Sequence, residues 1–254
     1  KKIIFIKSIY TMKFEHNIIF ETEEFQDNYK RINDTYDEDD FYTFTALYKN
    51  KKYMTIYVKT NCPKIPEDIH YLRILYLGNY TKFPKIPASV KVMRIGTGQM
   101  TELPEIPDTV IELSIYIDRE DGKLKNTGDL SYLKNLKKLV VEHRYRHLAI
   151  GKLPESLRLF SSIGINGTIT LPVKFPKNLF FIHLHGLLNV DIPDLSSLKK
   201  LKILSSRHSF IKSYSNPPIN SCEIRFISMR QGSKSLPINY RKDREKITYT
   251  FSNY

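Results

Sequence analysis

The 254-residue chain has no tryptophan and only two cysteines, and no apolar run approaches the roughly 20 residues that a membrane-spanning helix needs. Cys62 and Cys222 are too few for a disulfide framework, and two reduced, buried thiols in a cytosolic protein are the simplest interpretation. At 41% hydrophobic content, the chain can bury a core without disulfides or a metal. We therefore expect a cytoplasmic protein that does not span a membrane.

The sequence also lacks the motifs of common catalytic sites. It contains no phosphate-cradling glycine loop, serine elbow or Cys-His nucleophile pair. His183 and His185 alternate on one predicted strand without a third ligand, and the four-residue spacing of His143 and His147 would matter only on a helix. We expect no enzymatic activity, no cofactor and no metal site.

What the chain does contain is an isoleucine-proline pair that returns three times, at Ile65-Pro66, Ile86-Pro87 and Ile106-Pro107. Apolar residues follow each isoleucine after four, seven and nine positions, as Ile69, Leu72 and Ile74 follow the first. A fixed period of 20 to 21 residues predicts a solenoid of stacked units.

The pattern continues downstream with looser spacing and gives eight predicted units. Their first inward-facing strand residues are Leu72, Met93, Leu113, Leu139, Phe160, Ile182, Leu201 and Ile224. In the fifth unit, Ser162 occupies the slot that branched aliphatic residues fill elsewhere, which leaves a register shift of one residue open.

Each unit contains an apolar residue, one free position and a second apolar residue, which is typical of a short strand with alternate side chains directed inward. Such strands are stable when they stack in parallel, because neighbours share backbone hydrogen bonds and build one continuous core. In the linker of residues 103–107, Pro104 and Pro107 oppose a helix. The predicted fold is therefore mainly β, with a parallel concave sheet and a convex side of extended segments or 3₁₀ turns.

These features resemble leucine-rich repeats of the short, proline-linked variety. Residues 86–96 look like the FNIP repeat of social amoebae and amoeba-infecting giant viruses, and residues 103–107 resemble the repeats of bacterial IpaH and YopM effectors. The resemblance covers roughly residues 61–236, although the usual asparagine after the strand motif is mostly missing. It implies a viral or effector-like recognition protein in the cytoplasm, the host cytoplasm or a virion, and it does not identify a ligand.

The ends of the chain lack the repeat. Residues 40–48 and 52–59 are rich in aromatic and branched side chains around a plausible turn at residues 49–51, which predicts a β-hairpin that caps the solenoid. An earlier strand pair, at residues 3–9 and 13–20, is expected to join it. We predict a β-rich cap at residues 1–60, the solenoid at 61–236 and a capping strand at 237–254, where Ile247, Tyr249 and Phe251 alternate with polar residues.

Strand alternation also predicts which side chains face the concave surface. The central column is expected to read Arg73, Arg94, Ser114, Val140, Ser161, His183, Lys202 and Arg225, beside an apolar row that reads Leu75, Gly96, Tyr116, Glu142, Ile163, His185, Leu204 and Ile227. Arginine next to exposed aromatic and aliphatic residues is typical of protein-recognition surfaces. The predicted partner-binding residues are Arg73, Leu75, Arg94, Tyr116, His183, His185, Lys202, Leu204, Arg225 and Ile227.

The charge is concentrated in the repeats and the C-terminal region. Residues 1–60 are balanced, so the net charge of +13 arises wholly from residues 61–254, and residues 199–254 hold 12 basic and 3 acidic groups. Such a field favours an acidic partner, although lysine-rich surfaces also serve solubility alone.

These observations favour a non-enzymatic protein-binding or scaffold module that uses the concave face and the basic C-terminal end. One alternative is a nucleic-acid-binding protein in which Tyr214, Tyr240 and Tyr249 add stacking to the basic C-terminal region. The other alternative is a structural component of a viral particle or assembly.

Overall fold

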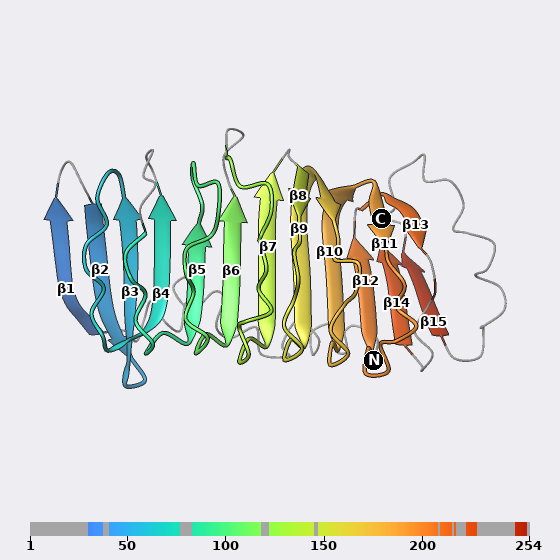
Figure 1. The fold of residues 1–254 in the computed structure, drawn as a ribbon, viewed down its shortest axis with the longest axis horizontal. Coiled ribbons are helices and arrows are strands. Elements are labelled where there is room, and N and C mark those ends of the chain that lie inside the picture. The colour runs from blue at the N-terminus through green and yellow to red at the C-terminus, as the bar shows by residue number, and fades with distance from the viewer. Residues whose placement is uncertain are drawn as a thin grey trace.

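The fold is mainly β, and Figure 1 shows its strands side by side in one long row. The computed structural model describes residues 30–37, 41–76, 83–117, 122–144, 147–207, 209–214, 216, 222–227 and 247–252. Across these ranges the chain forms strands, turns and extended linkers and contains no helix. A helix long and apolar enough to cross a membrane is accordingly absent from them.

One sheet runs the length of the molecule. It begins with three antiparallel strands, β1 (Lys30–Asp37), β2 (Phe41–Tyr48) and β3 (Lys51–Val58). From β3 onward every neighbouring pair is parallel, through β4 (Ile69–Tyr76), β5 (Val92–Gly96), β6 (Glu112–Ile117), β7 (Lys138–Arg144), β9 (Leu159–Thr170), β10 (Phe181–Leu188), β12 (Ile203–Arg207), β14 (Cys222–Ile227) and β15 (Ile247–Ser252). The parallel part forms a β-solenoid of about seven turns, which confirms the solenoid prediction.

The isoleucine-proline pattern defines the core, because its four apolar positions stack in register from one coil to the next. Ile74, Ile95 and Ile115 are direct neighbours on β4, β5 and β6, and each is fully buried. In the fifth unit the predicted register is correct, since Phe160 and Ser162 pair with Leu139 and Val141 of β7. Ser162 is therefore a polar residue in a core position, with no exposed surface.

In the proline-containing repeats, the chain turns at a hydrogen bond that the proline carbonyl accepts. The carbonyl of Pro87 accepts the backbone N–H of Val90 at 3.1 Å, and Pro66, Pro107, Pro154 and Pro176 form the equivalent i to i+3 bond. Proline suits this position because the turn uses its carbonyl and does not need the N–H that it lacks. The linkers are thus extended segments with single turns, as the proline spacing predicts.

Short polar side chains join each turn to the one before it. The hydroxyls of Ser89, Thr109 and Ser156 donate to the carbonyls of Ile69, Val90 and Leu136, at 2.8, 3.2 and 2.7 Å. The longer amides of Asn135 and Asn178 reach two residues further back, to the carbonyls of Asp108 and Glu155. This turn ladder satisfies carbonyls that the parallel strands leave unpaired.

Behind the main sheet, the later coils carry additional short strands. β8 (His147–Ala149) pairs with the second half of β9, and β11 (Val190–Ile192) pairs with β13 (Ile211–Tyr214). Glycine permits the close backbone contact beside this region. Gly186 has a φ of +66°, and a Cβ there would lie 2.0 Å from the carbonyl oxygen of Gly164.

The hairpin expected before the repeats is present as β2 and β3. Lys49 and Asn50 connect the strands with φ values of 48° and 59°, the left-handed geometry of a two-residue hairpin turn. The hairpin joins the sheet through parallel pairing of β3 with β4, while β1 was not predicted. The predicted closing strand is β15, whereas the strand pair expected at residues 3–9 and 13–20 lies outside the described residues.

We expect Gly186→Ala to lower the free energy of unfolding by about 3 kcal/mol or more, because it adds left-handed strain to a direct clash between coils. Gly128→Ala is the matched control, since Gly128 has a φ of +72° and a Cβ added there would meet nothing within 4 Å. Its expected loss is about 1 kcal/mol. Urea unfolding curves of both variants would measure the difference, and equal losses would contradict the close contact between the coils.

Candidate functional site

The outward face of the sheet, opposite the core, carries the predicted recognition column. Its register is confirmed over six strands, where the residues in line are Arg73, Arg94, Ser114, Val140, Ser161 and His183. Ser205 and Arg225 continue the line on β12 and β14. Ser114, Val140, Ser161 and Ser205 are buried, so larger neighbours dominate the accessible surface of the column.

Two of the predicted partner-binding residues are not on this face. His183 pairs with Ser205 and His185 with Arg207, so Lys202 precedes β12 and does not belong to the column. Leu204 is fully buried in the core and cannot belong to the apolar row. The predicted register of this strand was wrong by three residues, because Leu195, Leu198, Leu201 and Leu204 follow one another at intervals of three and offer more than one match to the repeat.

A repeated segment in the sequence would have resolved this register. Residues 129–139 and 194–204 are identical at eight of eleven positions, which aligns Leu204 with Leu139 and Lys202 with Lys137. The structure treats the two segments alike. Leu133 and Leu198 each donate a backbone hydrogen bond three residues back, and Asp129 and Asp194 each accept the N–H of a serine two residues on.

The best-defined cluster on the outward face lies over β4, β5 and β6. Arg73 and Arg94 are direct neighbours, and the guanidinium carbon of Arg94 lies 5.5 Å from the ring centroid of Tyr116. Leu75 completes the group beside Gly96, where a Cβ would come within 3.0 Å of the leucine side chain. All four side chains are partly exposed. We call Arg73, Leu75, Arg94 and Tyr116 the arginine-tyrosine cluster.

Next to this cluster, β6 and β7 carry a shielded ion pair. Glu112 and Lys138 are direct neighbours, with 3.4 Å between carboxylate oxygen and ammonium nitrogen. Burial lowers the pKa of Lys138, and the attraction of Glu112 opposes that shift. Because breaking such a pair leaves one buried charge uncompensated, it fixes the local arrangement of the two strands.

Further along the face, aromatic rings of β10 lie in a row. The ring centroids of Phe181 and His183 are 6.1 Å apart, and those of His183 and His185 are also 6.1 Å apart. The two histidines thus project to the same side, as the sequence predicts. No group of three or more metal-ligating side chains occurs within the described residues.

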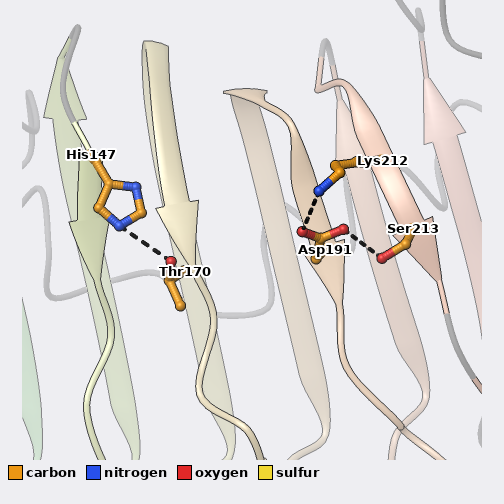
Figure 2. A network of polar contacts seen from close by, with 5 residues as sticks. All are labelled: His147, Thr170, Asp191, Lys212 and Ser213. Carbon is orange, nitrogen blue, oxygen red and sulfur yellow. Dashed lines mark hydrogen bonds and ion pairs between the residues drawn. The ribbon is translucent and has the colours of Figure 1, made fainter.

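The face behind the sheet carries a separate set of polar contacts, and Figure 2 shows those among His147, Thr170, Asp191, Lys212 and Ser213. The ring nitrogens of His147 lie 3.0 Å from the Thr168 hydroxyl and 3.2 Å from that of Thr170. The carboxylate of Asp191 accepts a hydrogen bond from Ser213 and pairs with Lys212 at 3.4 Å. These contacts join successive strands, and each polar group has another member of the set as its hydrogen-bond or ion-pair partner.

The edge at which the parallel strands begin is a more exposed surface, and Lys202 belongs to it. One residue of each coil stands in line there, joined to the next by a backbone hydrogen bond of 2.7 to 3.0 Å. We call this line the edge column; it consists of His70, Lys91, Ile111, Lys137, Arg158, Phe180 and Lys202. From Ile111 onward every member is exposed.

Comparison with protein-family models, curated proteins and solved structures finds no match for this chain. The leucine-rich-repeat resemblance therefore stays a prediction.

Cys62 is the cysteine whose surroundings the structure describes, and it is a poor nucleophile. Its side chain packs against the main core, and burial raises the pKa of its thiol to about 12. Because the thiolate is the reactive form, the thiol of Cys62 is almost wholly unreactive near neutral pH.

In a Cys222→Ser variant, we expect Cys62 to react with a disulfide reagent at pH 8 about 100-fold more slowly than free cysteine, since its thiolate is scarce. Thiol release followed by absorbance would measure the rate. Unfolding in guanidinium should restore the rate of free cysteine, and equally fast reaction of the folded protein would contradict the burial of Cys62.

Proposed function

We propose that this protein is a non-enzymatic binding module that holds an acidic protein segment against the arginine-tyrosine cluster of its outward face. The observation that carries the proposal is the side-by-side placement of Arg73 and Arg94 on β4 and β5. Parallel pairing sets neighbouring strands about 4.8 Å apart, so the two guanidinium groups are close enough for one acidic segment to reach both. Guanidinium groups bind carboxylates through charge-assisted hydrogen bonds.

The rest of the cluster supplies apolar contact next to the charges. The guanidinium of Arg94 lies over the ring of Tyr116, and Leu75 is in line with Tyr116 on β4, with Gly96 of β5 between them. Arginine and tyrosine are the residue types that most often dominate binding energy at protein interfaces. The favoured ligand therefore combines a carboxylate with a neighbouring aliphatic or aromatic side chain.

The sheet also suits this role mechanically. Each coil is fixed to both neighbours by strand pairing and by the turn ladder, so the cluster is held in place before a ligand arrives. Preorganisation of this kind reduces the entropic cost of binding. We further propose that the β2–β3 hairpin caps the solenoid, because its antiparallel pairing ends the parallel stack.

The aromatic row of β10 is a second contact area for the same partner. His183 and His185 are partly exposed on the outward face, and Arg225 and Ile227 follow in line on β14. A segment that crosses the strands at right angles would run from the arginine-tyrosine cluster to this row. The nucleic-acid and assembly-component alternatives have no support from the arginine-tyrosine cluster.

Selection of a displayed random-peptide library on the purified protein tests the proposal. The enriched peptides should combine Asp or Glu with aromatic or aliphatic residues, since these complement the cluster. We expect the double variant Arg73→Glu and Arg94→Glu to weaken capture of those peptides by roughly 100-fold or more, because each charge-assisted contact becomes repulsive.

The double variant Lys137→Glu and Lys202→Glu is the matched control, because it makes the same charge change outside the outward face. Its capture of the enriched peptides should stay close to that of the unmodified protein, and thermal unfolding would verify that all variants fold. A library without enriched acidic peptides, or equal capture by the double variant, would refute binding at the cluster.

A further inference from the structure

The edge at which the parallel strands begin carries an excess of cations in its later coils. In the first coils, Glu67, Asp68 and Asp108 of the turns are largely offset by Lys91 of the edge column and by Lys52 of β3, which pairs with Asp68. In the later coils the column contains Lys137, Arg158 and Lys202, all exposed. We call the part of this edge that residues 133–202 form the basic edge.

The turns of the basic edge add further cations beside the column. Lys134, Lys177, Lys199 and Lys200 occupy exposed turn positions. The one acid among these turns is Glu155, and its carboxylate accepts the backbone N–H of Lys177 at 3.2 Å. The column and these turns therefore hold seven cations and one acid over four successive coils.

Coil stacking makes the spacing of these cations regular. The backbones of Lys137, Arg158, Phe180 and Lys202 are hydrogen-bonded in sequence, so each step along the edge measures about 4.8 Å. Long, flexible side chains on such a line form a straight cationic track. In Figure 1 this track follows the lower ends of β7, β9, β10 and β12.

An exposed aromatic ring interrupts the track. Phe180 lies between Arg158 and Lys202 and is 38% exposed, although it precedes a strand whose inward residues are fully packed. A phenylalanine on the surface between two cations has no role in the core. Cations that follow a backbone, combined with an aromatic platform for a base, are the features of single-stranded nucleic-acid sites.

We propose that the basic edge binds single-stranded nucleic acid, with its cations on successive phosphates and an unstacked base on Phe180. This surface is distinct from the outward face that carries the protein-binding proposal, and neither proposal depends on the other. An acidic polypeptide would also use the cations, and polyglutamate is therefore included in the test below. A bilayer would require more than one apolar anchor, and Phe180 is the one that the column offers here.

The test is fluorescence anisotropy of a labelled oligothymidylate over a series of salt concentrations. For single strands, the slope of log affinity against log salt is about −0.7 for each phosphate neutralised. The triple variant Lys137→Gln, Arg158→Gln and Lys202→Gln should therefore reduce the magnitude of the slope by about 2. Each single variant should reduce it by about 0.7, which keeps the test usable if the triple variant does not fold.

The matched control removes three exposed lysines from the linkers behind the edge, through Lys123→Gln, Lys125→Gln and Lys174→Gln. This variant has the same net charge as the edge variant, and its slope should remain unchanged. An equal reduction in both variants would show that binding follows overall charge and would refute a site at the edge.

Phe180→Ala separates stacking from charge. We expect a roughly tenfold loss of affinity with an unchanged salt slope, because stacking contributes energy without releasing counterions. Ile111→Ala changes the edge-column residue of an earlier coil, outside the basic edge, and should leave the affinity unchanged. No binding of oligothymidylate at low salt would overturn the proposal, as would preferential binding to phosphatidylserine vesicles or polyglutamate.

Discussion

The structure depends on the hydrogen bonding of each coil to the coil before it. Parallel strands satisfy the backbone on the sheet, and the proline turns present carbonyls that short polar side chains of the next coil satisfy in turn. Because buried backbone groups must find partners, a coil is stable only when its neighbour is in register. The core, the recognition column of the outward face and the edge column are all consequences of that one register.

The same register explains how a chain with few glycines, and without a helix in its described part, presents functional side chains. Each strand position becomes a line across the molecule, so one residue type repeated at the period of the coil becomes a continuous surface. Arg73 and Arg94 meet through sequence positions 21 residues apart, and Lys137 and Arg158 meet in the same manner. Interaction surfaces of this kind need no tertiary folding beyond the stacking of coils.

The isoleucine-proline pattern was sufficient to predict the core and most of the outward face, and the composition of residues 40–59 predicted the hairpin. The failure at β12 has a physical origin, because leucines at 195, 198, 201 and 204 fit the core equally well in two registers. All four are fully buried, since those before the strand fill the turns of the coil. The edge column was missed because it follows hydrogen bonds between turns, and inward and outward alternation gives no information about residues that precede a strand.

Burial on the outward face also depends on neighbours that lie far apart in sequence. Ser114 and Val140 are shielded while Arg94 and Tyr116 remain partly exposed, and strand alternation assigns all such positions to solvent equally. The exposed edge contrasts with that face, because turns project beyond the stacked strands.

The excess of cations in the later coils makes the charge of the described coils uneven, and this gives them an electric dipole parallel to the long axis of the sheet. A negatively charged polymer in solution would exert a torque on this dipole and turn the β7–β12 end toward itself before any contact is made. Such orientation shortens the search for a productive encounter, and it weakens once salt reduces the Debye length to about 8 Å. The order in which the coils are stacked thus determines which end of the molecule arrives first.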